Sequence, residues 1–196
     1  LGPGALQLGL AALQQLDPLT EASQEAAQLA AASDLSIALA VWGQLGPTVV
    51  RLDEPRYPLH VNLRVGTVMS LFNTITGRVF AAYLPEKMVR SMLEDEHRRV
   101  VGGTSASFDA PEVQALLGEI RATGMGRGVS MPQPGVNTLC APVFDAAGHI
   151  ALVMTMIGPQ GVFDAEIDSA AGELLREHAR RTSLRLGHSV LTTAIG

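Results

Sequence analysis

The sequence predicts an α+β domain built around an antiparallel sheet. Along the 196 residues, helices come first, followed by a run of strands, more helices, a hairpin and a final helix. Strands that follow one another in a run, without alternating helices, exclude a βαβ arrangement. Turn signals at Gly43, Gly46, Pro55 and Gly66 separate the first strands and favour a meander.

Two helices are expected at the start of the chain. Residues 3–16 carry Leu6, Leu10 and Leu13 at helical spacing, and the polar residues before Asp17 are all Gln. A helix without charge buries more than one stripe, which suggests a partner helix or another subunit. The second helix is expected to begin at Asp17-Pro18.

Three strands should follow, and the third has the clearest pattern. They are expected over Ser36–Trp42, Pro47–Asp53 and Pro58–Val65. From Leu59 to Val65 apolar and polar residues alternate, which is the period of a half-buried strand.

The second half of the chain alternates helices with extended segments. Helices are expected over 76–83 and from Pro85, and residues 96–108 should form a polar loop. The spacing of Asp109 and Glu112 predicts a capped helix that ends at Gly124. The last helix should be capped by Asp164. Its expected inner stripe is Ile167, Ala171, Leu174 and Leu175.

Composition excludes several classes of protein. No apolar run approaches the roughly 18 residues of a membrane helix. The net charge is −5, and basic residues cluster only near the C-terminus. Positive charge there is expected to complement a helix dipole, and this interpretation is favoured over a nucleic-acid-binding surface. These basic residues are Arg176, Arg180, Arg181 and Arg185. A Gly-rich run at residues 124–128 lacks the strand, helix and lysine of a phosphate loop.

Metal and cofactor sites are not expected either. The histidines have no second ligand at the spacing of a helical zinc site; they are His60, His97, His149, His178 and His188. A single cysteine excludes an internal disulfide, and with no signal peptide it favours a reducing cytoplasm. The missing initiator Met suggests a fragment of a longer protein.

Cys140, the single cysteine, lies in the stretch TLCAPVFDAAGH, residues 138–149. Nucleophilic cysteines usually occupy a helix N-terminus or an electropositive cleft, which lowers their pKa. Cys140 lies instead in the middle of an apolar strand, so a buried core residue is favoured and the wall of a ligand pocket comes second. A small hydrolase or transferase that uses Cys140 stays open as the alternative.

The same stretch predicts a hairpin that turns at residues 145–148. With Phe144 opposite His149, the register pairs Pro142 with Ala151, Cys140 with Val153, and Thr138 with Thr155. The residues expected on one face of the sheet are Thr138, Cys140, Val153, Thr155 and Ile157. Pro142 indicates that a bulge could alter this register.

Several segments, in order over nearly the whole chain, resemble one family. They are LGPGAL at 1–6, VNLRVG at 61–66, TITGR at 74–78 with AAYLP at 81–85, PGV at 134–136, APVFD at 141–145 and GP at 158–159. Together they resemble the effector-binding domain of IclR-type transcriptional regulators. The resemblance implies an α+β, GAF-like domain, with a curved antiparallel sheet flanked by helices, that is not an enzyme.

The resemblance also implies a domain organisation. Residues 1–16 would be a helix that links to a winged helix-turn-helix domain outside this sequence, residues 17–188 the effector-binding domain, and residues 189–196 a C-terminal tail. DNA would be contacted only through that upstream domain. A cytoplasmic homodimer or homotetramer without membrane contact is expected. Its effector would favour one arrangement of subunits, and the choice between activation and repression stays open.

Matching the family's pocket by position, and adding Cys140 from the predicted hairpin face, gives an expected effector site. It consists of Val61, Met69, Ile75, Thr76, Gly77, Gly128, Val136, Thr138, Cys140, Thr155 and Ile157. Free N–H groups at the helix start would attract a carboxylate.

The departures from the family's pattern make this pocket less polar. Some members have an acidic residue at the position of Gly128, a cysteine at that of Thr138, and serines at those of Thr155 and Ile157. Ile75 replaces a small residue. The expected effector is therefore a small organic acid that is aromatic or fairly apolar, with threonine hydroxyls and the amides near Gly77 as anchors. An alternative is that the larger side chains fill the cavity, leaving a ligand-free dimerisation module.

Overall fold

The computed structural model describes residues 18–55, 63–99 and 107–189. The expected helix over residues 3–16, the site residue Val61 and almost all of the 189–196 tail lie outside these residues.

Five helices and five strands make up the described part of the chain. They are α2 (Pro18–Ser33), β1 (Ser36–Gly43), β2 (Gly46–Asp53), α3 (Ile75–Tyr83), α4 (Glu86–Arg99), α5 (Pro111–Thr123), β3 (Gly126–Gly128), β4 (Val136–Phe144), β5 (Ile150–Pro159) and α6 (Ala170–Arg185). The strands form one sheet in the order β2-β1-β5-β4-β3, and every neighbouring pair is antiparallel. The predicted α+β class with an antiparallel sheet is confirmed.

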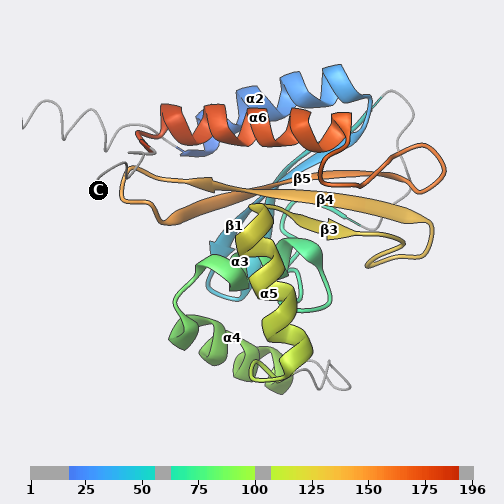
Figure 1. Cartoon of the computed structure of the whole chain (residues 1–196). Helices are drawn as coiled ribbons and strands as arrows, with labels where there is room; N and C mark the ends of the chain where they lie inside the picture. Colours follow the sequence, from blue (N-terminus) through green and yellow to red (C-terminus); the bar gives the residue numbers. More distant parts are fainter. Residues whose placement is uncertain (1–17, 56–62, 100–106, 190–196) are drawn as a thin grey trace, which may run out of the picture.

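The helices cover both faces of this sheet (Figure 1). Helices α2 and α6 lie side by side on one face, and α3 and α5 lie on the other with α4 beyond them. Side chains of β4 and β5 therefore alternate between two buried cores, which explains why these strands read as nearly continuous apolar runs. Leu139 and Met154 face α2 and α6, whereas Cys140 and Val153 face α3.

The predicted third strand is wrong in its described part. Leu63 has no strand pairing, and the chain turns at Val65 and Gly66, where Gly66 has a φ of 89°. An isolated bridge between Thr48 and Val68 and a few backbone hydrogen bonds join the following segment to β2, but this segment forms no strand. The sheet is not a meander, because β5 and not a third consecutive strand pairs with the other edge of β1.

The hairpin turns where predicted, but its register is two residues away from the predicted one. Cys140 pairs with Thr155 and Thr138 with Ile157. The turn takes in His149, so that Phe144 pairs with Ile150, and the irregularity between Val143 and Phe144 adds a second residue on β5. The pairs predicted with Val153, Thr155, Ala151 and His149 are therefore wrong. A shift of two preserves the parity, so the predicted face of the sheet is the observed one.

The predicted cap of α5 is wrong because another partner competes for Asp109. Ala110 is the N-cap residue and makes no side-chain cap. The Asp109 carboxylate instead accepts from Arg90 of α4, with Nη1–Oδ2 at 2.8 Å, and these hydrogen bonds lower the pKa of Asp109. Helix α4 continues to Arg99, into the segment expected to be a loop.

The predicted cap of α6 lies too early in the chain. Ser169 caps this helix by accepting from the N–H of Gly172 at 3.2 Å. Asp164 forms a turn of its own by accepting from the N–H of Glu166 at 3.0 Å. Ile167 consequently lies before the helix, not on its inner stripe.

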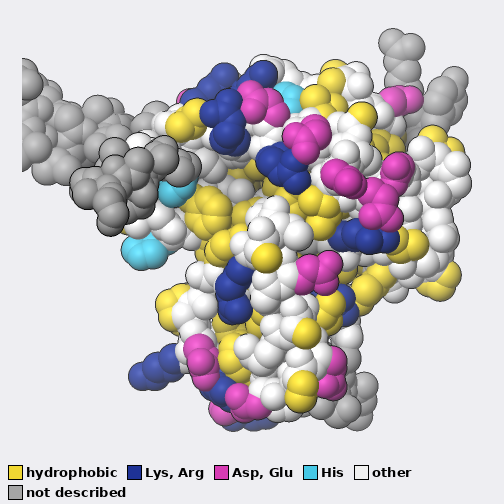
Figure 2. Space-filling view, viewed as in Figure 1, with side chains coloured by type: hydrophobic (Ala, Val, Ile, Leu, Met, Phe, Trp, Pro, Cys, Tyr) yellow, Lys and Arg dark blue, Asp and Glu magenta, His cyan; other side chains and the backbone are white. Residues whose placement is uncertain are grey.

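The arginines of α6 are paired with carboxylates (Figure 2). Arg180 and Arg181 both donate to Glu177, at 2.9 and 2.8 Å, and lower the pKa of this carboxyl to about 2. Basic and acidic side chains alternate along the helix on the visible face, so they do not form an uninterrupted basic surface. Within the described residues, no helix combines the length and apolar composition needed to cross a bilayer.

A buried carboxylate joins α2 to α6. Glu25 of α2 is fully buried, and its Oε2 lies 2.6 Å from Nδ1 of His178. Arg185 Nη2 lies 3.0 Å from the other oxygen, Oε1, without the alignment of a hydrogen bond. Because a buried charge is costly without partners, the two helices are held in a fixed relative position by this contact.

We expect Glu25→Ala to lower the free energy of unfolding by about 3–5 kcal/mol, because it leaves the buried side of His178 without its partner. Urea denaturation followed by Trp42 fluorescence measures this loss. Glu21→Ala is the matched control, since Glu21 lies 3.4 Å from Arg185 at a partly exposed position and should cost less than about 1 kcal/mol. Equal losses in both variants would contradict the assigned role of Glu25.

Candidate functional site

The N-terminus of α3 packs unusually close to the chain that precedes it. Thr74 is the N-cap, and its Oγ1 accepts from the N–H of Gly77 at 3.0 Å and donates to the carbonyl of Ser70 at 2.8 Å. A Cβ atom at Gly77 would lie 2.2 Å from that carbonyl oxygen and 2.6 Å from the carbonyl oxygen of Leu71. Since both obstacles are backbone, only glycine fits at this position.

Strand β3 approaches the same end of α3 through two glycines. A Cβ atom at Gly126 would lie 2.7 Å from Ile75 Cγ2, and one at Gly128 would lie 2.6 Å from Ile75 Cγ1. The Ile75 side chain therefore occupies the space that side chains on β3 would need. It is held between the helix and the strand and is 1% exposed.

A cavity of about 320 Å³ lies beside the start of α3, and we call it the α3 cavity. Its walls come from α3 and the segment before it, from the loop after β3, and from β4 and β5. The lining residues are Leu63, Met69, Thr74, Ile75, Thr76, Pro132, Gln133, Val136, Thr138, Thr155 and Ile157.

Buried threonines supply the polar part of this cavity. Thr76 Oγ1 and Thr155 Oγ1 share a hydrogen bond of 3.0 Å, and Thr138 Oγ1 donates to the carbonyl of Met131 at 3.1 Å. These hydroxyls are satisfied without a ligand, yet each oxygen can still accept. Among the described residues that line the cavity, none carries a charge.

Backbone donors are available at the same wall. The first N–H groups of a helix have no partner within it, and Thr74 satisfies that of Gly77. By the same rule the N–H groups of Ile75 and Thr76 have no acceptor within the helix. The amide of Gly77, predicted as an anchor, is already engaged by Thr74.

The structure brings most of the predicted site residues together. Seven line the α3 cavity: Met69, Ile75, Thr76, Val136, Thr138, Thr155 and Ile157. Gly128 lies against Ile75, and Gly77 lies against the backbone of Ser70 and Leu71. Val61 lies outside the described residues.

Cys140 lies one layer deeper than the cavity wall. Its Sγ is 3.3 Å from Thr155 Oγ1 and 3.6 Å from Thr76 Oγ1, beneath the pair of hydroxyls. The residue is completely buried, and this burial raises the pKa of its thiol to about 11. Such a thiol is a structural residue and not a nucleophile.

Four lining residues were not predicted from the sequence. Thr74 could have been found, because a threonine three residues before Gly77 has the spacing of an N-cap. Leu63 lies within the predicted third strand, at a position where the structure has an irregular segment instead. Pro132 and Gln133 lie on the exposed rim, in a loop where the N–H of Met131 donates to the carbonyl of Val136, and no local pattern predicts that loop.

A metal centre has no support in the described ranges. No three His, Cys, Asp or Glu side chains in them come together as ligands would. The arrangement is that of a binding site: a largely apolar cavity with a few converging hydroxyls and helix N–H groups.

The chain is similar to known proteins in sequence and in fold. The family model described as "Bacterial transcriptional regulator IclR C-terminal" matches residues 10–184. The crystal structure of HmgR from Pseudomonas aeruginosa is similar with a TM-score of 0.87 and 38% identity, over 97% of this chain and 75% of that chain.

More distant relatives share the fold. The Thermotoga maritima IclR structure is similar with a TM-score of 0.74 at 18% identity, over 95% of this chain and 75% of that one. The HTH-type transcriptional repressor AllR of Klebsiella pneumoniae is 24% identical over 188 residues, which are 95% of this chain and 68% of AllR.

Gly77→Ala should lower the free energy of unfolding by about 1–3 kcal/mol, because the new methyl group meets backbone oxygens that cannot move aside easily. Gly118→Ala, in the middle of α5, is the matched control. A Cβ atom there meets nothing within 4 Å, so the better helix propensity of alanine should add about 0.5–1 kcal/mol. Chemical denaturation measures both, and a Gly77→Ala variant as stable as the parent chain would refute the close contact.

Alkylation of Cys140 should be slow in the folded chain. A pKa of about 11 against an ordinary 9.0 makes the thiolate about a hundredfold rarer at neutral pH. The iodoacetamide rate, followed by mass spectrometry, should therefore be at least about a hundredfold lower than in urea. It should still be rising at about pH 10, because a raised pKa delays ionisation. Fast labelling that levels off below about pH 8 would favour the enzyme alternative instead.

Proposed function

The chain belongs to the IclR family of bacterial transcriptional regulators, as an effector-binding domain of that family, and from this premise we propose that the α3 cavity is its effector pocket. The family regulates transcription and is not enzymatic. A catalytic role for Cys140 is thereby excluded, in agreement with its burial beneath Thr76 and Thr155.

The composition of the cavity wall is the observation that carries the proposal. Apolar side chains make up most of it, and four threonines and one glutamine are the polar side chains that line it. A volume of about 320 Å³ lies at the lower end of the roughly 300–1,000 Å³ that small-molecule pockets span. An open cavity of this kind supports a ligand-binding domain over a filled, ligand-free dimerisation module.

The effector we propose is a small organic acid that is aromatic or fairly apolar. Its carboxylate would accept from the N–H groups of Ile75 and Thr76 and from the threonine hydroxyls, where the dipole of α3 also favours negative charge. Its apolar part would contact Val136, Ile157 and Met69.

A tiny keto acid fits this wall less well. Ile75 occupies the space beside Gly128, where a relative's acidic side chain would lie. A small polar ligand would leave the apolar wall in contact with water or empty space. Burial of apolar area is instead favourable by about 25 cal/mol per Å², which favours a larger apolar group.

The mechanism we propose for signalling works through α3. This helix supplies one wall of the cavity and packs on α5 and on the sheet. An effector that binds one position of α3 more tightly than another shifts the population between them. In a cytoplasmic homodimer or homotetramer this shift would move the upstream DNA-binding domains, and AllR, a relative named as a repressor, suggests repression as the output.

A panel of acids tests the proposal by calorimetry. We expect benzoate and phenylacetate to bind more tightly than pyruvate and glyoxylate. Thr155→Val keeps the side-chain shape and removes one hydroxyl from the cavity, so it should weaken the binding of the preferred acid about tenfold. Thr123→Val, at the end of α5 and outside the cavity, should leave binding unchanged. Tight binding of glyoxylate with no binding of aromatic acids would overturn the choice of ligand.

A further inference from the structure

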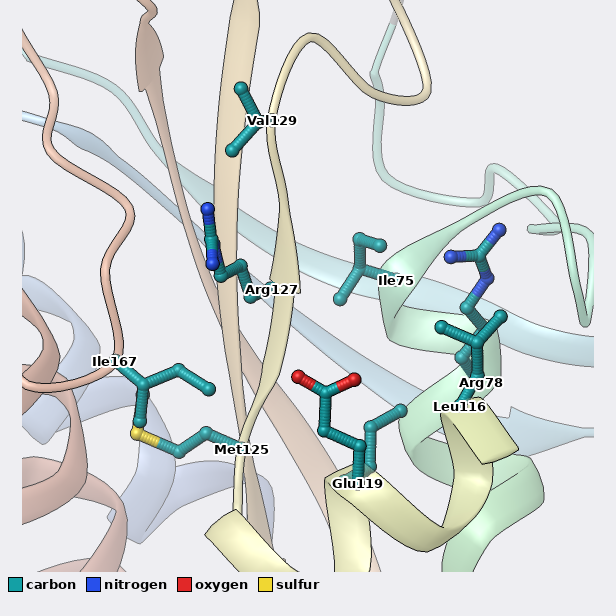
Figure 3. Close-up of a pocket in the computed structure, with 9 residues that line it drawn as sticks. Ile75, Arg78, Leu116, Glu119, Met125, Arg127, Val129 and Ile167 are labelled. Atoms are coloured by element: carbon teal, nitrogen blue, oxygen red, sulfur yellow. The ribbon is translucent and has the colours of Figure 1, made fainter. Parts of the chain in front are cut away.

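A second cavity lies on the other side of Ile75 (Figure 3), and we call it the α5 cavity. Its volume is about 250 Å³. It opens between α3, α5, β3 and the segment that precedes α6. The lining residues are Ile75, Arg78, Leu116, Glu119, Ile120, Met125, Arg127, Val129 and Ile167.

Arg78 contributes a cation to this cavity. Its Nε donates to the carbonyl of Phe72 at 2.8 Å, which fixes the guanidinium at the cavity. Among the described residues, no carboxylate forms an ion pair with it. The side chain is half-buried, and this burial lowers the pKa of Arg78. An anion placed here would recover interaction energy that the guanidinium lost on leaving water.

Glu119 contributes an exposed carboxylate to the same cavity. Its side chain extends from α5, and its carboxylate lies apart from the guanidinium of Arg78 (Figure 3). The two groups do not form an ion pair. No basic side chain of the described ranges pairs with Glu119. Arg127, which lines the cavity too, is already engaged by Glu166 at 2.8 Å.

Apolar side chains form the rest of the wall. Leu116 and Val129 are 37% and 46% exposed, which is high for large apolar residues beside a cavity. Met125 is buried at the base of the α5 cavity. Ile75 separates the α5 cavity from the α3 cavity. A ligand that covers Leu116 and Val129 would remove this apolar surface from water.

We propose that the α5 cavity binds a small zwitterion with an apolar side chain, of the class of the apolar α-amino acids. The carboxylate pairs with Arg78, the ammonium group pairs with Glu119, and the side chain lies against Leu116 and Val129. One ligand then satisfies a cation and an anion that do not satisfy each other. The proposal does not depend on the assignment of the α3 cavity.

Calorimetry with L-leucine tests this site on the folded chain. Isocaproate has the same apolar group without the ammonium, and isoamylamine has it without the carboxylate. Each should bind at least about tenfold more weakly than L-leucine, because isocaproate leaves Glu119 and isoamylamine leaves Arg78 without an ion-pair partner. Equal binding of either analogue, or no saturable binding of L-leucine, overturns the proposal.

Glu119→Gln is the decisive variant, because Glu119 is exposed on α5 and its replacement keeps the shape of the side chain. It should weaken L-leucine binding about tenfold. Glu112→Gln, at an exposed position of the same helix outside the cavity, should leave it unchanged. Thr155→Val changes the α3 cavity and not the α5 cavity, so it distinguishes binding at the two. It should likewise leave the binding of L-leucine unchanged. Unchanged binding in Glu119→Gln, or equal weakening in Glu112→Gln or Thr155→Val, overturns the site.

Discussion

The rest of the site depends on how closely the first turn of α3 approaches its neighbours. Gly77 lets the backbone of Ser70 and Leu71 cross the helix, and Gly126 and Gly128 let β3 pack directly on Ile75. None of these contacts tolerates a Cβ atom without movement. The result is a helix start held from two sides, with one branched side chain between two cavities. A helix fixed in this way presents its free N–H groups in a constant direction, which a preorganised binding site requires.

The two faces of the sheet bury different kinds of side chain. The face under α2 and α6 is filled with apolar side chains, and its buried carboxyl group, that of Glu25, has His178 as a partner. The face toward α3 instead buries hydroxyls of Thr76, Thr138 and Thr155. Burial of a polar group without a hydrogen bond costs roughly 1–3 kcal/mol. Because these hydroxyls bond to one another or to Met131, this face can keep a cavity without losing stability.

Sequence periodicity placed the site on the correct face although the register was wrong. The longer turn and the bulge beside Phe144 each change the pairing by one residue, and a total change of two leaves the side chains of the paired strands on their own faces. Helix caps were less predictable. Asp109 has the spacing of a cap, yet Arg90, which is 19 residues away, takes its carboxylate. Leu63, Pro132 and Gln133 reach the cavity from irregular segments, and neither period two nor period 3.6 describes such segments.

The sizes of Ile75 and Gly128 depend on each other. A Cβ atom at Gly128 would lie 2.6 Å from Cγ1 of Ile75, which is too close for two carbon atoms. The large residue on α3 therefore requires glycine at this position of β3. Ile75 lines both cavities and forms the wall between the α3 cavity and the α5 cavity. Since Ile75 is confined, ligands in the two cavities could influence each other only by moving α3 as a body. Any such coupling would be reciprocal, because each ligand's preference for one position of α3 changes the other's affinity by the same factor.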